Sequence, residues 1–187
     1  MAGLGLRTRK ITPLPFSTRR GTPPFTSNGT FLLKWGIANC GTGASSSPVG
    51  IDVDATGTVY VTSLGQPSAI QKFSSTGSFL GEVGSPGSAA GFVYGPAAVV
   101  VDAEGRVYEA DGPANRVQVF TSAGDFLVGW GSEGSGPGQF SGPIGIALGP
   151  GGEIYVSDVN NYRIEKFGDL STPALRSTWG RLKTIYR

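Results

Sequence analysis

Short stretches in which apolar and polar residues alternate recur along this chain at a nearly constant interval. The three most regular stretches align without a gap: VGIDVDATGTVYV (residues 49–61), AAVVVDAEGRVYE (97–109) and IGIALGPGGEIYV (144–156). A period of two places successive side chains on opposite sides of a β-strand, so each stretch predicts a strand with one buried and one exposed face. The predicted buried face of the first strands carries Ile51 and Val53, Val99 and Val101, and Ile146 and Leu148.

Each repeat unit is predicted to contain four strands joined by tight turns. The first strand leads through a glycine-containing turn to a second strand around a tyrosine, a third strand ends on a phenylalanine, and a fourth ends on a glycine. These positions are Tyr60, Tyr108 and Tyr155, then Phe73, Phe120 and Phe167, then Gly84, Gly131 and Gly180. A fixed period of roughly 40–50 residues built from short strands is typical of β-propeller blades. We therefore predict an all-β fold, a β-propeller arc.

The repeat divides the chain into an arm, a propeller segment and a tail. Residues 1–24 contain four prolines and no periodicity, which predicts a disordered basic arm. The propeller segment spans 25–180, and 181–187 form a basic tail. Within the propeller segment we predict one extra outer strand in 25–36 and three four-stranded blades at 49–84, 97–131 and 144–180. The last strand of the third blade is expected to be less regular because Pro173 lacks the N–H of a ladder donor.

Composition supports this fold and excludes several kinds of chemistry. Glycine accounts for 31 of the 187 residues and is spaced at turn positions. The chain contains no histidine, which excludes Ser–His and Cys–His nucleophilic pairs and every His-ligated metal site. The single Cys40 has no basic neighbour in the sequence and is expected to be an inert thiol. No apolar run has the length of a membrane span or a signal peptide, so a cytoplasmic location is the default expectation.

The net charge of +2 hides an uneven distribution of charged residues. Residues 1–24 carry five basic residues and 176–187 carry four, with no acid in either segment. The repeat body between them holds all 13 acids and six bases. Because neutralisation of phosphates dominates nucleic-acid affinity, an acidic body does not favour a nucleic-acid partner.

The second unit, VVVDAEGRVYEADGPANRVQVFTSAGDFLVGWG (99–131), resembles the NHL repeat, a family of β-propeller blades. The matching features are an Asp-Gly-type turn, a tyrosine-containing strand, an Asp ahead of an Asn-Arg pair, a Val-Gln-Val-Phe strand and a closing Trp-Gly. The linker GSGPGQF (134–140) also resembles the sequence that connects blades in that family, and the resemblance extends over about 25–180. In the first unit, the Asp and Arg of the family pattern are replaced by Ser63 and Ala69.

The resemblance implies about six blades, whereas this chain contains three. Closed propellers typically have 4–8 blades. Three arrangements fit the count: a longer chain that supplies further blades, an open arc with exposed edges, and a homo-oligomer that closes the ring. An unpaired edge strand favours pairing with another chain.

The loop between the second and third strands carries candidate binding residues in two blades. They are Asp111, Asn115 and Arg116 in the second blade, and Asp158, Asn161 and Arg163 in the third. Loops on one propeller face contact ligands in many propellers, so these residues are candidates for binding a protein partner or a small ligand. The alternative is structural, because Asp and Asn form turns and Arg ties neighbouring blades by charge-assisted hydrogen bonds. Recurrence in successive blades favours the structural role.

Acidic residues near the innermost strands suggest a second kind of site. Carboxylates around a propeller channel suit Ca²⁺, and Asp52, Asp54 and Asp102 lie in or beside the first strands. The third unit has Ala147 and Gly149 instead, which interrupts the ring of acids. We therefore expect Asp54 and Asp102 to be turn residues and predict no metal and no cofactor.

Glu109 departs from the repeat, because the other units have Val61 and Val156 at this position. A buried carboxylate needs a partner, and burial raises its pKa. We expect Glu109 either to reach the edge of the blade or to pair with Arg106, and an acid facing the channel is the alternative. The three tryptophans at equivalent strand ends, Trp35, Trp130 and Trp179, are interpreted as packing residues.

Together these features favour a non-catalytic β-propeller scaffold that binds a protein or a ligand on one face, and not an enzyme. The alternative is a hydrolase or lyase with a channel-bound metal, because propellers of the NHL or related type include an α-amidating lyase and lactone hydrolases. The absence of histidine and the interrupted ring of acids disfavour that alternative. RNA binding is a third hypothesis and rests on the basic ends alone.

Overall fold

A computed structural model of the 187-residue chain describes residues 32–35, 47–64, 68–87, 89–168 and 170. The chain divides into two compact units, 1–33 and 34–187, and every strand of the described residues lies in the second. The predicted arm (1–24), the basic tail (181–187), Cys40 and Trp179 lie outside the described residues. So does the predicted last strand of the third blade with Pro173.

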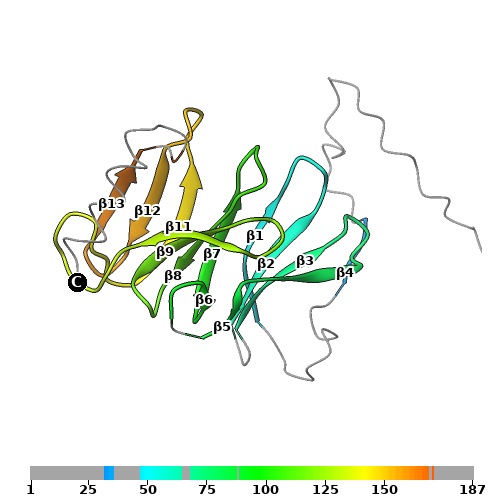
Figure 1. Ribbon diagram of the computed structural model, residues 1–187, viewed down its shortest axis with the longest axis horizontal. Coiled ribbons are helices and arrows are strands. Elements are labelled where there is room, and N and C mark those ends of the chain that lie inside the picture. Colours follow the sequence, from blue (N-terminus) through cyan, green and yellow to red (C-terminus); the bar gives the residue numbers. More distant parts are fainter. Residues whose placement is uncertain (1–31, 36–46, 65–67, 88, 169, 171–187) are drawn as a thin grey trace, which may run out of the picture. The chain divides into compact units, whose positions relative to one another are not determined.

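Three antiparallel sheets follow one another along the chain, as predicted (Figure 1). Blade 1 has the order β1-β2-β3-β4, with bounds Ser47–Val53, Val59–Leu64, Ala69–Phe73 and Phe79–Val83. Blade 2 has the order β7-β8-β9-β10, with bounds Pro96–Val101, Val107–Asp111, Arg116–Phe120 and Phe126–Trp130. Blade 3 has the three described strands β11 (Pro143–Leu148), β12 (Ile154–Asp158) and β13 (Arg163–Phe167). The short strands β5 (Ser85–Pro86) and β6 (Phe92–Val93) pair in the linker between blades 1 and 2.

The repeated phenylalanine marks the same register in every blade. Phe73 pairs with Val59, Phe120 with Val107, and Phe167 with Ile154, so the third strand always ends opposite the first residue of the second strand. The register of each first strand is interrupted by a bulge near its start. This common register is the physical basis of the 47-residue period.

The turns between first and second strands are built by the predicted aspartates. The Asp54 carboxylate accepts hydrogen bonds from the N–H groups of Thr56 and Thr58 at 2.9 Å each. Asp102 accepts from the corresponding N–H groups in blade 2, at 3.1 and 2.8 Å. Gly57 closes the first of these turns with a φ of 88°, a conformation that glycine adopts at low cost. The predicted role of both aspartates as turn residues is confirmed.

The cores lie between blades. One cluster joins blades 1 and 2 and consists of Tyr60, Ile70, Val83, Val93, Val99, Val107 and Phe120. A second joins blades 2 and 3 and consists of Tyr108, Val117, Val119, Phe140, Ile154 and Val156. A third cluster, Val59, Val61 and Phe73, lies on the other face of blade 1. Blades 1 and 2 thus bury apolar side chains on both of their faces.

The expected burial of the first strand is wrong for blade 1. Ile51 and Val53 are 66% and 52% exposed, whereas the equivalent Val99 of blade 2 is 3% exposed. The alternation in the sequence is the same, but in blade 1 only the part of this face on the second and third strands is buried, at Val59, Val61 and Phe73.

The predicted extra outer strand is described only over residues 32–35, and these four residues form no strand. Trp35 nevertheless packs on Phe73, with ring centroids 6.4 Å apart, much as Trp130 packs on Phe167 at 5.4 Å. These contacts support packing as the role of the two tryptophans.

Candidate functional site

In blade 2 the predicted Asp111–Arg116 pair clamps the linker that precedes its own blade. The fully buried Asp111 carboxylate accepts hydrogen bonds from the N–H groups of Tyr94 and Gly95, at 3.1 and 2.9 Å. Arg116 Nη2 bonds the same carboxylate at 3.0 Å and donates to the carbonyl oxygen of Phe92 at 2.6 Å. The pair therefore satisfies the backbone of the loop that connects blades 1 and 2.

Blade 3 repeats this clamp with different linker atoms. Asp158, also fully buried, accepts a hydrogen bond from the N–H of Ser141 at 2.6 Å and from Arg163 Nε at 2.9 Å. The Arg163 guanidinium donates to three linker carbonyls, those of Ser135, Gly136 and Gln139.

The electrostatics of Asp158 match this structural role. Burial raises the pKa of its carboxyl, but hydrogen bonds from Ser141, Asn161 and Arg163 and the charge of Arg163 lower it more, so the pKa lies below its usual value of 3.8. Because the folded state favours the ionised form of Asp158, this residue contributes to the stability of the folded protein above pH 3.8. The contribution is lost as the pH falls through the lower folded-state pKa.

The two predicted asparagines have different roles. Asn115 adopts a left-handed conformation (φ 52°), and its Oδ1 accepts a hydrogen bond from the N–H of Gly142 in the following linker at 2.8 Å. Asn161 instead donates from Nδ2 to the Gly134 carbonyl in the preceding linker at 2.8 Å. The sequence pattern suggested the same role for both asparagines, although Asn115 bonds to the linker after its blade and Asn161 to the linker before its blade.

The six predicted site residues thus form two separate structural clamps, one per blade, and do not converge on one site. Their polar groups bond to linkers of the same chain, which supports the structural interpretation. Binding of a partner by these residues stays a prediction. Blade 1 has Ser63 and Ala69 in place of the clamp, and the Ser63 hydroxyl donates to the Ala69 carbonyl at 3.3 Å.

Glu109 is fully buried and points into the interface between blades 1 and 2. Its Oε2 accepts a hydrogen bond from Gln118 Nε2 at 3.3 Å, while Oε1 has no hydrogen-bond partner among the described residues. Burial and the nearby Asp111 charge raise its pKa well above 4.5, against smaller opposite effects of Gln118 and Arg116. The expected pairing with Arg106 is wrong, because Arg106 bonds Asp102 and Glu104 instead. Side chains three residues apart along extended chain point to opposite faces.

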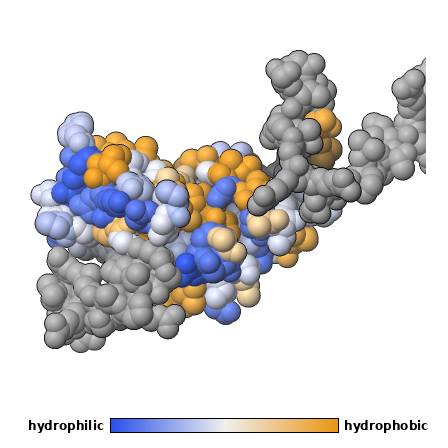
Figure 2. Space-filling view, turned by 90° about the horizontal axis from the view of Figure 1, so that it is seen from above, coloured by the Kyte–Doolittle hydropathy of each residue, from blue (hydrophilic) through white to orange (hydrophobic). Residues whose placement is uncertain are grey.

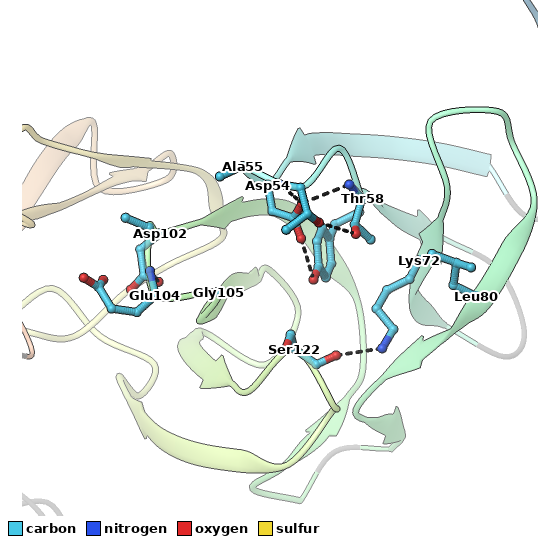
Figure 3. Close-up of a pocket in the computed structure, with 12 residues that line it drawn as sticks. Asp54, Ala55, Thr58, Lys72, Leu80, Asp102, Glu104, Gly105 and Ser122 are labelled. Atoms are coloured by element: carbon cyan, nitrogen blue, oxygen red, sulfur yellow. Dashed lines mark hydrogen bonds between the residues drawn. The ribbon is translucent and has the colours of Figure 1, made fainter. Parts of the chain in front are cut away.

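Two neighbouring grooves lie between the turns of successive blades. The first, shown in Figure 3, has a volume of about 420 Å³ and lies between the Asp54 turn of blade 1 and the Asp102 turn of blade 2. The second, of about 430 Å³, lies between the Asp102 turn and the turn around Gly149 of blade 3. Figure 2 views the molecule from the side that carries these turns and shows hydrophilic and hydrophobic patches next to one another on that face.

Tyrosine–aspartate contacts are repeated in the walls of the grooves. The hydroxyl of Tyr60 donates to Asp54 at 3.3 Å, and that of Tyr108 donates to Asp102 at 2.9 Å. Burial and the Asp54 carboxylate raise the pKa of Tyr60 above 10.0. Burial also raises the Asp54 pKa, but hydrogen bonds from Thr56 and Thr58 outweigh it and leave that pKa below 3.8. The wall of the first groove therefore presents the ionised Asp54 carboxylate and the neutral Tyr60 phenol at neutral pH.

The basic side chains near the grooves are held by the protein itself. Lys72 Nζ donates to the Ser122 carbonyl at 2.6 Å, which ties blade 1 to blade 2 (Figure 3). Arg106 Nε bonds Asp102 at 2.5 Å. Glu104, whose side chain is 68% exposed, lies in the turn shared by both grooves. Sequence reasoning missed Lys72 and Glu104, although the recurring turn that carries Glu104 was visible in the alignment.

Within the described residues no group of three or more acidic or thiol side chains is arranged to hold a metal ion. Asp52, which was considered for such a site, accepts a hydrogen bond from the Val101 N–H of blade 2 at 2.7 Å. No helix of the described residues is long and apolar enough to cross a membrane.

Comparison with known proteins supports the fold. Residues 140–167 match the model of the NHL repeat. A search of curated proteins gives no match. A solved streptogramin B lyase is 22% identical, with a TM-score of 0.51 over 69% of this chain and 45% of the lyase. A solved virginiamycin B lyase from Staphylococcus aureus is 21% identical, with a TM-score of 0.48 over 68% of this chain and 43% of the lyase. A protein of unknown function from Bacteroides caccae is 15% identical, with a TM-score of 0.45 over 68% of this chain and 47% of that protein.

This chain spans less than half the length of each of these solved structures. At such identities the likeness concerns the fold alone. The repeat in the sequence, the three successive antiparallel sheets and the match to the repeat model agree with one another. The chain folds as consecutive blades of a β-propeller, and residues 140–167 of its third blade match the NHL repeat.

Proposed function

We propose that this protein is a non-catalytic β-propeller scaffold that binds a polypeptide partner across the turns of successive blades. The observation that carries this proposal is the pair of neighbouring grooves of nearly equal volume, about 420 and 430 Å³, lined by equivalent turns. An extended segment is the ligand that matches a binding surface repeated once per blade. A catalytic site, by contrast, needs one convergent set of groups.

Charge indicates the kind of partner. Asp54, Asp102 and Glu104 line the first groove, while the one lysine of that groove is engaged with a backbone carbonyl. A partner segment with lysine or arginine residues complements this surface, and such complementarity favours association and correct orientation. The most exposed acid, Glu104, is therefore expected to contribute most to recognition.

Selection from a library of displayed random peptides tests the proposal. We expect enrichment of peptides that contain lysine or arginine, and we expect Glu104→Lys to weaken their binding at least about tenfold, or 1.4 kcal/mol. Glu133→Lys is the matched control, because it makes the same change of charge at an exposed acid in a linker at the opposite end of the strands. Binding is measured by titration calorimetry with an enriched peptide.

Three results would contradict the proposal. The first is equal loss of binding in both variants, and the second is no enrichment of any peptide. The third is turnover of a substrate by the purified protein, tested with streptogramin B, a panel of lactones and peptide amides. Turnover would favour the enzymatic alternative of a hydrolase or lyase, which the fold allows.

A further inference from the structure

The first groove, between blades 1 and 2, has two chemically different ends. At one end lies the Asp102 turn with Glu104, whose side chain is 68% exposed. At the other end lies Leu80 of β4, which is 54% exposed. Figure 3 shows Glu104 and Leu80 on opposite sides of the groove, with Asp54 and Ser122 between them. The groove therefore offers an acid at one end and an apolar side chain at the other.

The apolar end is built by Leu80 together with the aliphatic part of Lys72. Lys72 Nζ donates to the Ser122 carbonyl at 2.6 Å, which holds the side chain across the groove. Its Cε lies 3.8 Å from the point that a Cβ on Gly81 would occupy, so the stem runs over β4 next to Leu80. Long basic side chains commonly lay their methylene groups along apolar surface. The methylene groups of Lys72 thus extend the apolar surface of Leu80.

The acidic end depends on Glu104, because the other two acids of the groove are committed to their own turns. The Asp54 carboxylate accepts hydrogen bonds from N–H groups of the turn that it begins. Asp102 is paired with Arg106. Glu104 approaches Arg106 with one oxygen at 3.4 Å and is otherwise exposed. A basic residue of a partner is the group that complements this carboxylate.

The places of the two ends in the fold set the spacing of the partner residues. Leu80 lies on β4, the fourth strand of blade 1, whereas Glu104 follows β7, which lies beside β1 and β2. The two ends are therefore about two and a half strand spacings apart, roughly 12 Å at about 4.8 Å per strand. About four residues of extended chain span roughly 13 Å, and side chains an even number of residues apart point to the same side.

We propose that the first groove binds an extended polypeptide segment in which a lysine or arginine and a large aliphatic residue stand about four positions apart. The basic residue pairs with Glu104, and the aliphatic residue packs on Leu80 and the stem of Lys72. This inference rests on the proposed function and adds to it the sequence pattern of the partner. The second groove does not offer the same two ends, because Leu127, the equivalent of Leu80 in blade 2, does not line it.

Peptides derived from one enriched by display test the spacing. Its basic residue is kept, a single leucine is placed about three, four or five positions away on either side, and other apolar residues are replaced by serine. We expect the even separation, in one of the two directions, to bind at least about tenfold more tightly than both odd separations. An odd separation places the two side chains on opposite sides of an extended segment. Titration calorimetry measures the affinities.

Substitution of Leu80 tests the contact from the side of the protein. Leu80→Ser is expected to weaken binding of the best of these peptides about tenfold. It should leave unchanged the binding of the same peptide with its leucine replaced by alanine, because the two substitutions remove one shared contact. Leu127→Ser is the matched control, since Leu127 is 47% exposed at the equivalent position and lines neither groove. It should leave both affinities unchanged.

Failure of this inference is distinguishable from failure of the proposed function. Equal affinity at all separations, or equal effects of Leu80→Ser and Leu127→Ser, would overturn the contact with Leu80. If Glu104→Lys still weakens binding in that case, the scaffold proposal stands. If display yields no binding peptide, or Glu104→Lys has no effect, both are overturned. The peptide series uses the unmodified protein, so it decides the spacing even if Leu80→Ser fails to fold.

Discussion

Replacing Asp111 with alanine is expected to lower the free energy of unfolding by about 3–5 kcal/mol, the usual cost of breaking a buried ion pair by removing one partner. The Asp111 carboxylate is fully buried and bonded to Arg116 and to two linker N–H groups. Its removal leaves those donors and a guanidinium that is 14% exposed without their acceptor. Urea unfolding monitored by circular dichroism measures the change.

Blade 1 supplies the control for this experiment. Ser63 is buried at the position equivalent to Asp111 and makes one weak hydrogen bond, at 3.3 Å, to a carbonyl of its own blade. Ser63→Ala is expected to cost about 1 kcal/mol or less, the net contribution of a typical hydrogen bond. If the two variants lose similar stability, the clamp does not hold the linker as the structure indicates.

Replacing Glu109 with valine or glutamine is expected to stabilise the protein at neutral pH by about 1–3 kcal/mol, the cost of burying a polar group without full compensation. One carboxylate oxygen of Glu109 has no partner among the described residues. Valine is the residue at this position in both other blades, where it is 5% exposed or less. The measurement is again urea unfolding, made as a function of pH.

The pH dependence distinguishes this explanation from a simple packing effect. The folded-state pKa of Glu109 lies well above 4.5, so the folded protein keeps a proton that the unfolded chain releases. The stability of the unmodified protein therefore decreases as the pH rises from about 4.5 towards the folded-state pKa. The advantage of Glu109→Gln is expected to be small near pH 4 and to grow as the pH rises. Glu104→Gln, at an exposed acid of the same blade, should show no such trend, and a constant advantage of Glu109→Gln across the range would contradict the assignment.

Much of the fold could be predicted because its signals are local. The strand alternation, the aspartate turns and the spacing of Phe73, Phe120 and Phe167 depend on neighbours within a few residues or within one hairpin. The error at Glu109 shows the limit of such signals. Its partner Gln118 lies directly across the sheet, and the strand register that opposes them becomes known only once the strands are paired.

The candidate site could be predicted only in part. The clamp residues were recognised from their recurrence, and the structure shows what they hold: linker groups mostly 16–28 residues away in sequence, such as Gly95 for Asp111 and Ser135 for Arg163. The grooves were not predicted, because each is formed by turns from two blades, and their separation is set by the packing between sheets.

The sequence by itself determined the repeat, the strands and turns of each unit, and the residue pattern from which Glu109 departs. Only the tertiary structure decided which apolar faces are covered. Ile51 and Val99 follow the same alternation, yet one is 66% and the other 3% exposed. The physical reason is that alternation specifies which side of a strand is apolar, whereas burial requires another part of the protein to pack against that position.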